Sequence, residues 1–216
     1  MKIFKFALVL ISLSTQAFSQ STLVCLGDSL TAGLGLNEDQ AYPALLEAKL
    51  KGWKVLNAGV SGDTTAGGLK RLDWLLKSRP EAVFVALGAN DGLRGVKPAE
   101  TEKNLNAILA KIKASGAKAY MAGMMVPSNY GEEYFFDFKV LFPRVAKKQS
   151  VPLLSFLLEG VGGIERLNQA DGIHPTAEGA QIVAGHVYAF LKDRLPQAGS
   201  GPSAPAAKVI RSKKDL

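Results

Sequence analysis

The stretch that decides the fold is Leu23-Val24-Cys25-Leu26-Gly27-Asp28-Ser29-Leu30, an apolar run that stops at a glycine and then turns polar. A short run without alternation is typical of a strand that is buried on both faces, as in a parallel sheet. Cys25 lies inside the run, where a thiol acts as a small hydrophobe. The residues after Gly27 therefore fall at the carboxyl end of the first predicted strand.

Similar apolar runs follow at 53–56, 82–87, 119–123 and 151–154, with helical patterns between them. Leu105, Ile108, Leu109 and Ile112 are spaced i, i+3, i+4, i+7 along one helix face. Further helices are predicted over 69–76 and 183–191. Strands that alternate with helices predict a parallel sheet covered by helices on both faces. We therefore predict one α/β domain with five parallel strands.

The composition is that of an ordinary globular protein, with 216 residues, 47% hydrophobic and 21% charged. One cysteine excludes a disulfide within the chain, and two histidines leave few ligands for zinc, so we expect no metal. The net charge is +7, but much of it lies in Lys2, Lys5 and the last twenty residues. The body is nearly neutral, and we expect no nucleic-acid partner.

The two ends differ in character from the body. Residues 1–19 are predicted to be a signal peptide, since Lys2 and Lys5 precede a short apolar run and Ala17-Phe18-Ser19 is typical of a cleavage site. An uncleaved amphipathic anchor is the alternative. Residues 197–216, rich in Gly, Pro and Ser, are predicted to be a flexible basic tail. The folded domain would span 20–196 in a periplasmic or secreted protein without a stable membrane anchor.

Small and polar residues follow the predicted strands. Because ligands bind beyond the carboxyl ends of parallel strands, these residues are candidates for a functional site. They are Gly27-Asp28-Ser29 after the first strand, 57–63 after the second, Gly88-Ala89-Asn90-Asp91 after the third, and Asp171-Gly172-Ile173-His174-Pro175 before the last helix.

Ser29 could be an exposed nucleophile on a strand-to-helix turn, although a capping or turn serine is the commoner role for one residue alone. A serine nucleophile needs a base, and the chain offers His174 and His186. His186 lies among apolar residues of a predicted helix, which is typical of packing. Asp171, three residues before His174, could orient its ring. An ordinary Asp turn with a surface histidine remains the alternative.

Acyl transfer also requires hydrogen-bond donors that face the developing oxyanion. The backbone N–H groups of Ser29 and Gly62 and the side-chain amide of Asn90 are candidates. Gly62 in a tight turn and Asn90 in an Asx-turn would be ordinary alternatives. Turns do not readily explain why all these groups fall at one edge of the predicted sheet.

Four of these blocks resemble the SGNH (GDSL) hydrolase family, in order and spacing, from about Leu23 to Leu195. The matching blocks are Gly27-Asp28-Ser29-Leu30, Gly62, Gly88-Ala89-Asn90-Asp91 and Asp171-Gly172-Ile173-His174. The resemblance implies a flavodoxin-like three-layer α/β/α sandwich with a five-stranded parallel sheet. It also implies Ser29 as nucleophile, His174 as base, Asp171 as its orienter, and Ser29, Gly62 and Asn90 as the oxyanion hole.

Ser61-Gly62-Asp63-Thr64, residues 90–95 and residues 127–131 are similar to the periplasmic thioesterase, lysophospholipase and arylesterase branch of that family. The resemblance implies a monomeric serine hydrolase that needs no cofactor and cleaves small acyl esters or thioesters. It implies a mobile loop over 91–95. Substrate contacts are expected from Asp28, Asp91, Gly92, Leu93, Val126, Pro127 and Tyr130.

Three other functions stay open on the sequence. A carbohydrate O-acetylesterase of the same family would use the same blocks. A flavodoxin-like sheet can also bind flavin phosphate, although Asp28 places a carboxylate where the phosphate would lie. A non-catalytic binding module would keep the fold without the chemistry.

Overall fold

The computed structural model describes residues 20–199, so the predicted signal peptide and most of the predicted tail lie outside the described residues. Five parallel strands form one sheet in the order β2-β1-β3-β4-β5, which confirms the predicted sheet. The strands are β1 (Ser21–Gly27), β2 (Trp53–Gly59), β3 (Ala82–Ala86), β4 (Lys118–Ala122) and β5 (Leu153–Leu154). Gly27 pairs with Gly59 and Ala86, so the carboxyl ends of three strands lie level at one edge.

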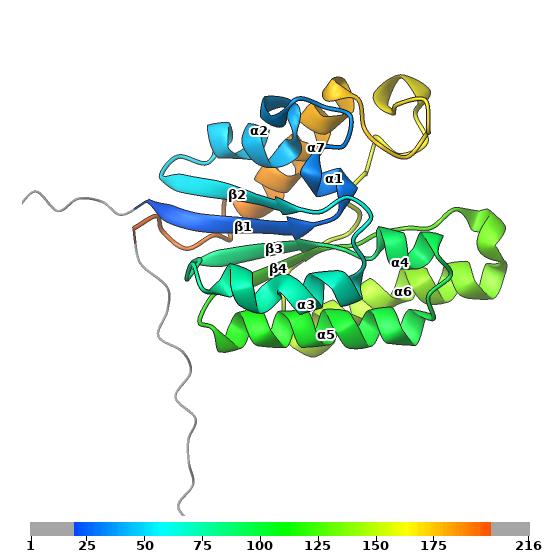
Figure 1. Cartoon of the computed structure of the whole chain (residues 1–216), viewed down its shortest axis with the longest axis horizontal. Helices are drawn as coiled ribbons and strands as arrows, with labels where there is room; N and C mark the ends of the chain where they lie inside the picture. Colours follow the sequence, from blue (N-terminus) through cyan, green and yellow to red (C-terminus); the bar gives the residue numbers. More distant parts are fainter. Residues whose placement is uncertain (1–19, 200–216) are drawn as a thin grey trace, which may run out of the picture.

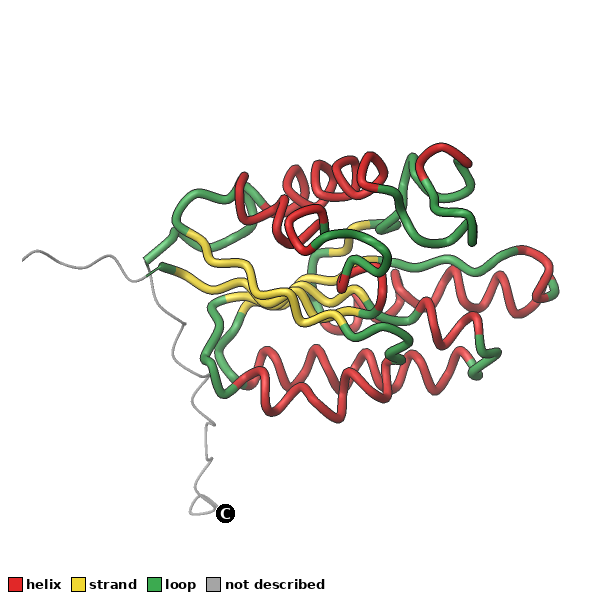
Figure 2. The backbone as a smooth tube through the Cα atoms, turned by 45° about the horizontal axis from the view of Figure 1, so that its top comes forward, coloured by secondary structure: helices red, strands yellow, loops and turns green. Residues whose placement is uncertain are grey.

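Helices cover both faces of the sheet, as Figure 1 shows, and the three layers agree with the predicted sandwich. One face carries α1 (Ser29–Ala32), α2 (Tyr42–Lys49) and α7 (Ala177–Leu191). The other carries α3 (Thr65–Leu76), α4 (Ala89–Leu93), α5 (Pro98–Ala114) and α6 (Glu132–Gln149). Short 3-10 turns are η1 (Glu38–Gln40), η2 (Ser128–Tyr130) and η3 (Glu165–Leu167). In Figure 2 the strands form a yellow band between the red helix layers.

The core forms where apolar side chains of the strands meet the helices. Leu23, Cys25 and Phe84 are fully buried in the central strands. The predicted stripe of α5 is fully buried as well. Burial of such side chains stabilises the fold by about 1.5–3 kcal/mol for each large residue.

The sequence reasoning missed α2 and α6. In α6, Phe138, Leu141, Phe142 and Val145 follow helical spacing and are buried. Pro143 lies within the helix and hides this pattern, because proline removes a backbone donor and usually ends a helix. Tertiary packing of the apolar face therefore outweighs the local preference.

Glycines at the carboxyl edge let α1 fold back over the strand ends. A Cβ at Gly27 would lie 1.9 Å from Thr31 Oγ1, and one at Gly59 would lie 2.1 Å from the Ala32 nitrogen. Since no side chain fits there, these glycines fix where Ser29 stands relative to β1 and β2.

The described chain ends at the opposite edge of the sheet, where β1 begins. The Gly199 N–H donates to Ser21 Oγ at 2.9 Å, so the first residues of the predicted tail contact the domain. Within residues 20–199, no helix is both long enough and apolar enough to cross a membrane.

Candidate active site

Ser29 is the first residue of α1, directly beyond β1. Asp28 caps this helix, because its Oδ1 accepts the Leu30 N–H at 3.0 Å. Gly33 ends the helix in the left-handed conformation, with φ 79°. Ser29 is 8% exposed and lines the adjoining pocket. The strand-to-helix turn thus both buries and orients the side chain.

The structure brings Ser29, His174 and Asp171 together in one hydrogen-bonded chain. His174 Nε2 lies 2.8 Å from Ser29 Oγ, and His174 Nδ1 lies 2.7 Å from Asp171 Oδ2. When Nδ1 carries its proton toward the carboxylate, Nε2 is free to accept a proton from the hydroxyl. His186, the other histidine, lies within α7.

Asp171 closes an Asx-turn and contacts the imidazole at the same time. Its Oδ1 accepts the N–H groups of Ile173 and His174, both at 3.0 Å. These two bonds and the His174 ring lower the Asp171 pKa to about 2. The carboxylate is therefore ionised at neutral pH. The sequence left open whether Asp171 forms an ordinary turn or contacts the His174 ring. In the structure, the same carboxylate does both.

Three hydrogen-bond donors border the same pocket as the serine hydroxyl. Gly62 has φ 77°, and its N–H has no partner among the described residues. Arg94 donates to the Gly62 carbonyl at 2.8 Å, which fixes the turn. The Asn90 amide donates to Asp28 Oδ2 at 3.3 Å, leaving its second hydrogen for another acceptor. The Ser29 N–H is the third donor.

Asp28 is a fully buried carboxylate between the turns that carry Ser29 and Asn90. Burial raises its pKa to about 6, although the Leu30 N–H, the Asn90 amide and His174 favour the charged form. Its charge therefore costs folding free energy at neutral pH. In return, the carboxylate fixes the Asn90 side chain.

A cavity of about 550 Å³ opens beside Ser29, His174, Gly62 and Asn90. Its wall is largely apolar, and this character suits an acyl chain more than a sugar. The apolar lining residues are Leu30, Leu34, Ala89, Leu93, Met124, Met125, Val126, Pro127, Phe156, Leu158 and Ile173. The sequence reasoning missed Met124, Met125, Phe156 and Leu158, which follow the last two strands as the other site residues follow theirs.

Among the expected substrate contacts, Asp28, Leu93, Val126 and Pro127 line this cavity, whereas Asp91, Gly92 and Tyr130 do not. Asp91 is buried and accepts the Thr65 N–H at 2.8 Å, which joins α4 to the start of α3. Gly92 packs so closely that a Cβ would lie 2.2 Å from Val126 Cγ1. The Tyr130 hydroxyl donates to the Leu93 carbonyl at 2.9 Å. These three residues lie outside the cavity, and Gly92 and Tyr130 contact the lining residues Val126 and Leu93.

Hydrogen bonds involve residues 91–96, which include the segment 91–95 expected to be a mobile loop. The Val96 N–H donates to the Asp91 carbonyl at 3.0 Å, and the Tyr134 hydroxyl donates to the Val96 carbonyl at 2.9 Å.

Within residues 20–199, no group of three or more His, Cys, Asp or Glu side chains could hold a metal ion.

Residues 25–182 match the family model described as the GDSL-like Lipase/Acylhydrolase family. The chain is 42% identical over 193 residues to Esterase TesA of Pseudomonas aeruginosa, covering 87% of this chain and 96% of that protein. It is 42% identical over 179 residues to Thioesterase 1/protease 1/lysophospholipase L1 of Escherichia coli K12, covering 82% and 86%.

Solved structures agree with these sequence matches. The crystal structure of TesA gives a TM-score of 0.77 at 42% identity, covering 80% of this chain and 99% of that one. The psychrotrophic esterase EstA from Pseudoalteromonas sp., in a structure inhibited by monoethylphosphonate, also gives 0.77 at 32% identity, covering 80% and 97%.

Proposed function

This chain belongs to the GDSL-like lipase/acylhydrolase family and is an ester or thioester hydrolase, and from this premise we propose that Ser29, His174 and Asp171 are its catalytic triad. The observation that carries the proposal is the continuous hydrogen-bond chain of 2.8 and 2.7 Å. Nucleophile, base and orienting carboxylate need this connection to act as a unit.

In the acylation step, Ser29 Oγ attacks the carbonyl carbon while His174 Nε2 takes the hydroxyl proton. The ionised Asp171 stabilises the imidazolium that forms. The N–H groups of Ser29 and Gly62 and the amide of Asn90 stabilise the oxyanion. When the tetrahedral intermediate collapses, His174 gives its proton to the departing alcohol or thiol.

In the deacylation step, a water molecule replaces the departed group. His174 takes a proton from this water, which attacks the acyl-Ser29 carbonyl. When this second tetrahedral intermediate collapses, the bond to Ser29 Oγ breaks, His174 returns the proton to Oγ, and a carboxylic acid leaves. The same donors stabilise the second oxyanion, so one site serves both halves of the reaction.

The cavity wall supports an acyl substrate of the arylesterase, thioesterase or lysophospholipase type. Leu93, Val126 and Met125 carry no charge and offer contacts to a hydrocarbon chain. An acetylated saccharide would bury hydroxyl groups against this apolar wall without partners, which is costly. We also propose that the enzyme acts as a monomer after residues 1–19 direct its export to the periplasm or medium.

Replacing the nucleophile tests the triad directly. Ser29→Ala should lower kcat for a p-nitrophenyl ester by about 10⁵–10⁶, as loss of a triad nucleophile does. Ser78→Ala is the matched control, since Ser78 is exposed at the far end of α3. Circular dichroism should show that both variants stay folded. Near wild-type turnover in the folded Ser29→Ala variant would reject the assignment.

Covalent labelling gives a readout that does not depend on the choice of substrate. A fluorophosphonate should add one phosphonyl group to the protein, and peptide mass mapping should place it on Ser29. The His174→Ala variant should label far more slowly, because the hydroxyl then lacks its base. Labelling at another serine would contradict the proposal.

A further inference from the structure

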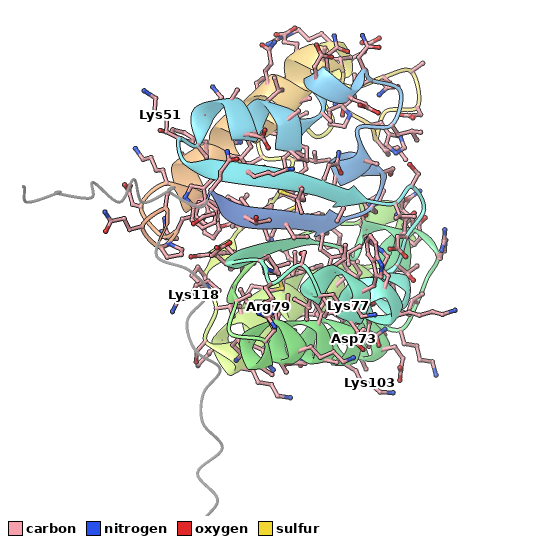
Figure 3. All side chains as sticks on the ribbon, turned by 60° about the vertical axis from the view of Figure 1, so that its left-hand side comes forward. Lys51, Asp73, Lys77, Arg79, Lys103 and Lys118 are labelled. Atoms are coloured by element: carbon pink, nitrogen blue, oxygen red, sulfur yellow. The ribbon has the colours of Figure 1, made fainter. Side chains whose placement is uncertain are left out.

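Exposed cations line the edge at the amino ends of the strands, opposite the active site. Figure 3 turns this side forward and labels Lys51, Lys77, Arg79 and Lys118. Lys51 follows α2, Lys77 and Arg79 follow α3, and Lys118 is the first residue of β4. All four are exposed. The near-neutral charge of the body therefore conceals a basic edge.

Helix dipoles explain only part of this distribution. The five longer helices α2, α3, α5, α6 and α7 end at this edge, and cations in a last turn stabilise the negative end of a helix. Lys49, Lys113 and Lys148 occupy such positions. Lys51, Arg79 and Lys118 lie in turns or at a strand start. Helix dipoles therefore do not account for these three cations.

Most of the acidic side chains at this edge already have a hydrogen-bond or ion-pair partner. Glu81 accepts the Thr22 N–H, and Glu47 accepts the Val55 N–H, both at 2.6 Å. Asp73 forms an ion pair with Lys111 at 2.7 Å. Asp193 is exposed and lies between Lys192 and Arg194 in the sequence. These four carboxylates keep their negative charge, but the cations at this edge outnumber them, so the edge stays positive.

A groove of about 540 Å³ concentrates this charge between β4, the end of α5 and the turn after α7. Lys113, Lys118 and Arg194 line it, and no acid does. Arg194 is held in place, since it donates to the Phe190 carbonyl at 2.7 Å and stacks over the Phe190 ring at 4.9 Å. Lys113 donates to the Gln149 carbonyl at 2.7 Å, which leaves it two further hydrogens.

The rest of the groove is mainly small or apolar. Its walls include Ala117, Ala119, Val151 and Pro152. Cations beside an apolar surface match the boundary of a lipid headgroup, where phosphate oxygens lie next to the glycerol and the first methylenes. A purely polar polyanion would leave the apolar part of the groove without a matching surface.

We propose that this basic edge binds the phosphate groups of an anionic phospholipid bilayer, with one headgroup phosphate in the groove between Lys113, Lys118 and Arg194. Basic clusters on a protein surface bind such bilayers electrostatically. Gly199, the last of the described residues, contacts Ser21 at the same edge. The enzyme would then lie on the bilayer with its active site turned away from it.

Vesicle sedimentation with the full chain tests the proposal. One set of vesicles contains equal amounts of phosphatidylglycerol and phosphatidylcholine, and the other contains phosphatidylcholine alone. The readout is the ratio of the two partition coefficients, because apolar insertion by any segment contributes to both. This ratio should be well above one and should fall when salt screens the charges.

Two double variants of equal net charge distinguish binding through the basic edge from attraction by the net charge of the protein. Lys113→Gln with Lys118→Gln should lower the ratio by roughly fivefold per cation. The control is Lys70→Gln with Lys139→Gln, which removes two exposed lysines from the middle of α3 and α6 and should change it little. Hydrolysis of a soluble p-nitrophenyl ester should be unchanged in both, which keeps this test independent of the proposed triad.

Each other outcome overturns the proposal. An equal loss in both double variants would mean that net charge, not this edge, attracts the protein. Release from the vesicles when phosphate replaces chloride at constant ionic strength would assign the groove to the free ion. Binding of a DNA duplex that depends on Lys113 and Lys118, without vesicle binding, would assign it to nucleic acid.

Discussion

The two edges of the sheet differ in how their charged side chains are held. At the carboxyl ends of the strands, Asp28 and Asp91 are buried and accept backbone hydrogen bonds. At the amino ends, Lys51 and Lys118 extend into solvent (Figure 3). A buried carboxylate with fixed partners can orient other groups, whereas an exposed cation acts mainly through its field. The first edge is therefore suited to chemistry and the second to attraction.

Several exposed apolar side chains lie at the carboxyl edge, around the cavity beside Ser29. Leu34, Met125 and Ile173 line the catalytic cavity and are each more than two-fifths exposed. Val60, 47% exposed, lies in the turn before Gly62. In the proposed mechanism, substrate passes this rim to reach Ser29. We expect changes at the catalytic edge to alter rates, and changes at the opposite edge to leave them nearly constant.

The largest effect should come from removing the negative charge of Asp171 at the carboxyl edge. Asp171→Asn keeps the acceptor for the Ile173 and His174 N–H groups but turns an NH₂ toward His174 Nδ1. The proton of the neutral ring then moves to Nε2, where it faces Ser29 and blocks base catalysis. Comparable changes lower kcat by about 10⁴. The measurement is kcat for a p-nitrophenyl ester.

Asp193→Asn is the matched control at the basic edge. It removes the same charge from an exposed site that no hydrogen bond links to the cavity. Its kcat should equal that of the wild type. A similar loss in both variants would show that the rate depends on overall charge, and the contrast between the edges would fail.

A smaller loss should follow the removal of one oxyanion donor. Asn90→Ala deletes the amide that lines the cavity, and the loss of such a donor lowers kcat by about 10²–10³. Asn106→Ala is the control, because that amide donates to the Glu102 carbonyl within α5. Substrate binding should change less than kcat, since the donor acts on charge that develops during the reaction. An effect on KM alone would remove Asn90 from the oxyanion hole.

The sequence predicted most of the fold because two periodicities are strong in it. The apolar run at 23–26 has no alternation, and the stripe of α5 is regular, so both elements were expected. By contrast, α6 contains Pro143, whose local preference opposes the helix. The charge of the basic edge was also hidden, because a sum over the body cancels cations and acids that the fold places at opposite edges.

The candidate site was predictable where residues follow strands and less so where loops fold back. Ser29, Gly62 and Asn90 all follow parallel strands, and parallel strands bring their carboxyl ends to one edge. Asp91 and Gly92 also follow a strand, yet α4 turns them toward α3 and α6. Sequence position gives the edge, but only the turn of the helix decides which side chains face the cavity.

The smallest effect concerns stability and its dependence on pH. The Asp28 pKa is raised from 3.8 to about 6, so between these values the folded protein keeps a proton that the unfolded chain releases. Wild-type stability should therefore fall as pH rises from 4 to 6, by about 3 kcal/mol for a shift of two units. Asp28→Asn has no such proton. Urea unfolding should show that the free energy of unfolding of Asp28→Asn rises, relative to that of the wild type, by up to that amount between pH 4 and 7.

The lowered pKa of Asp171 changes stability in the opposite direction, but it is present in both proteins and so cancels in their difference. If the difference in unfolding free energy between Asp28→Asn and the wild type does not change with pH, burial does not penalise the Asp28 charge. The two edges would then differ in geometry alone.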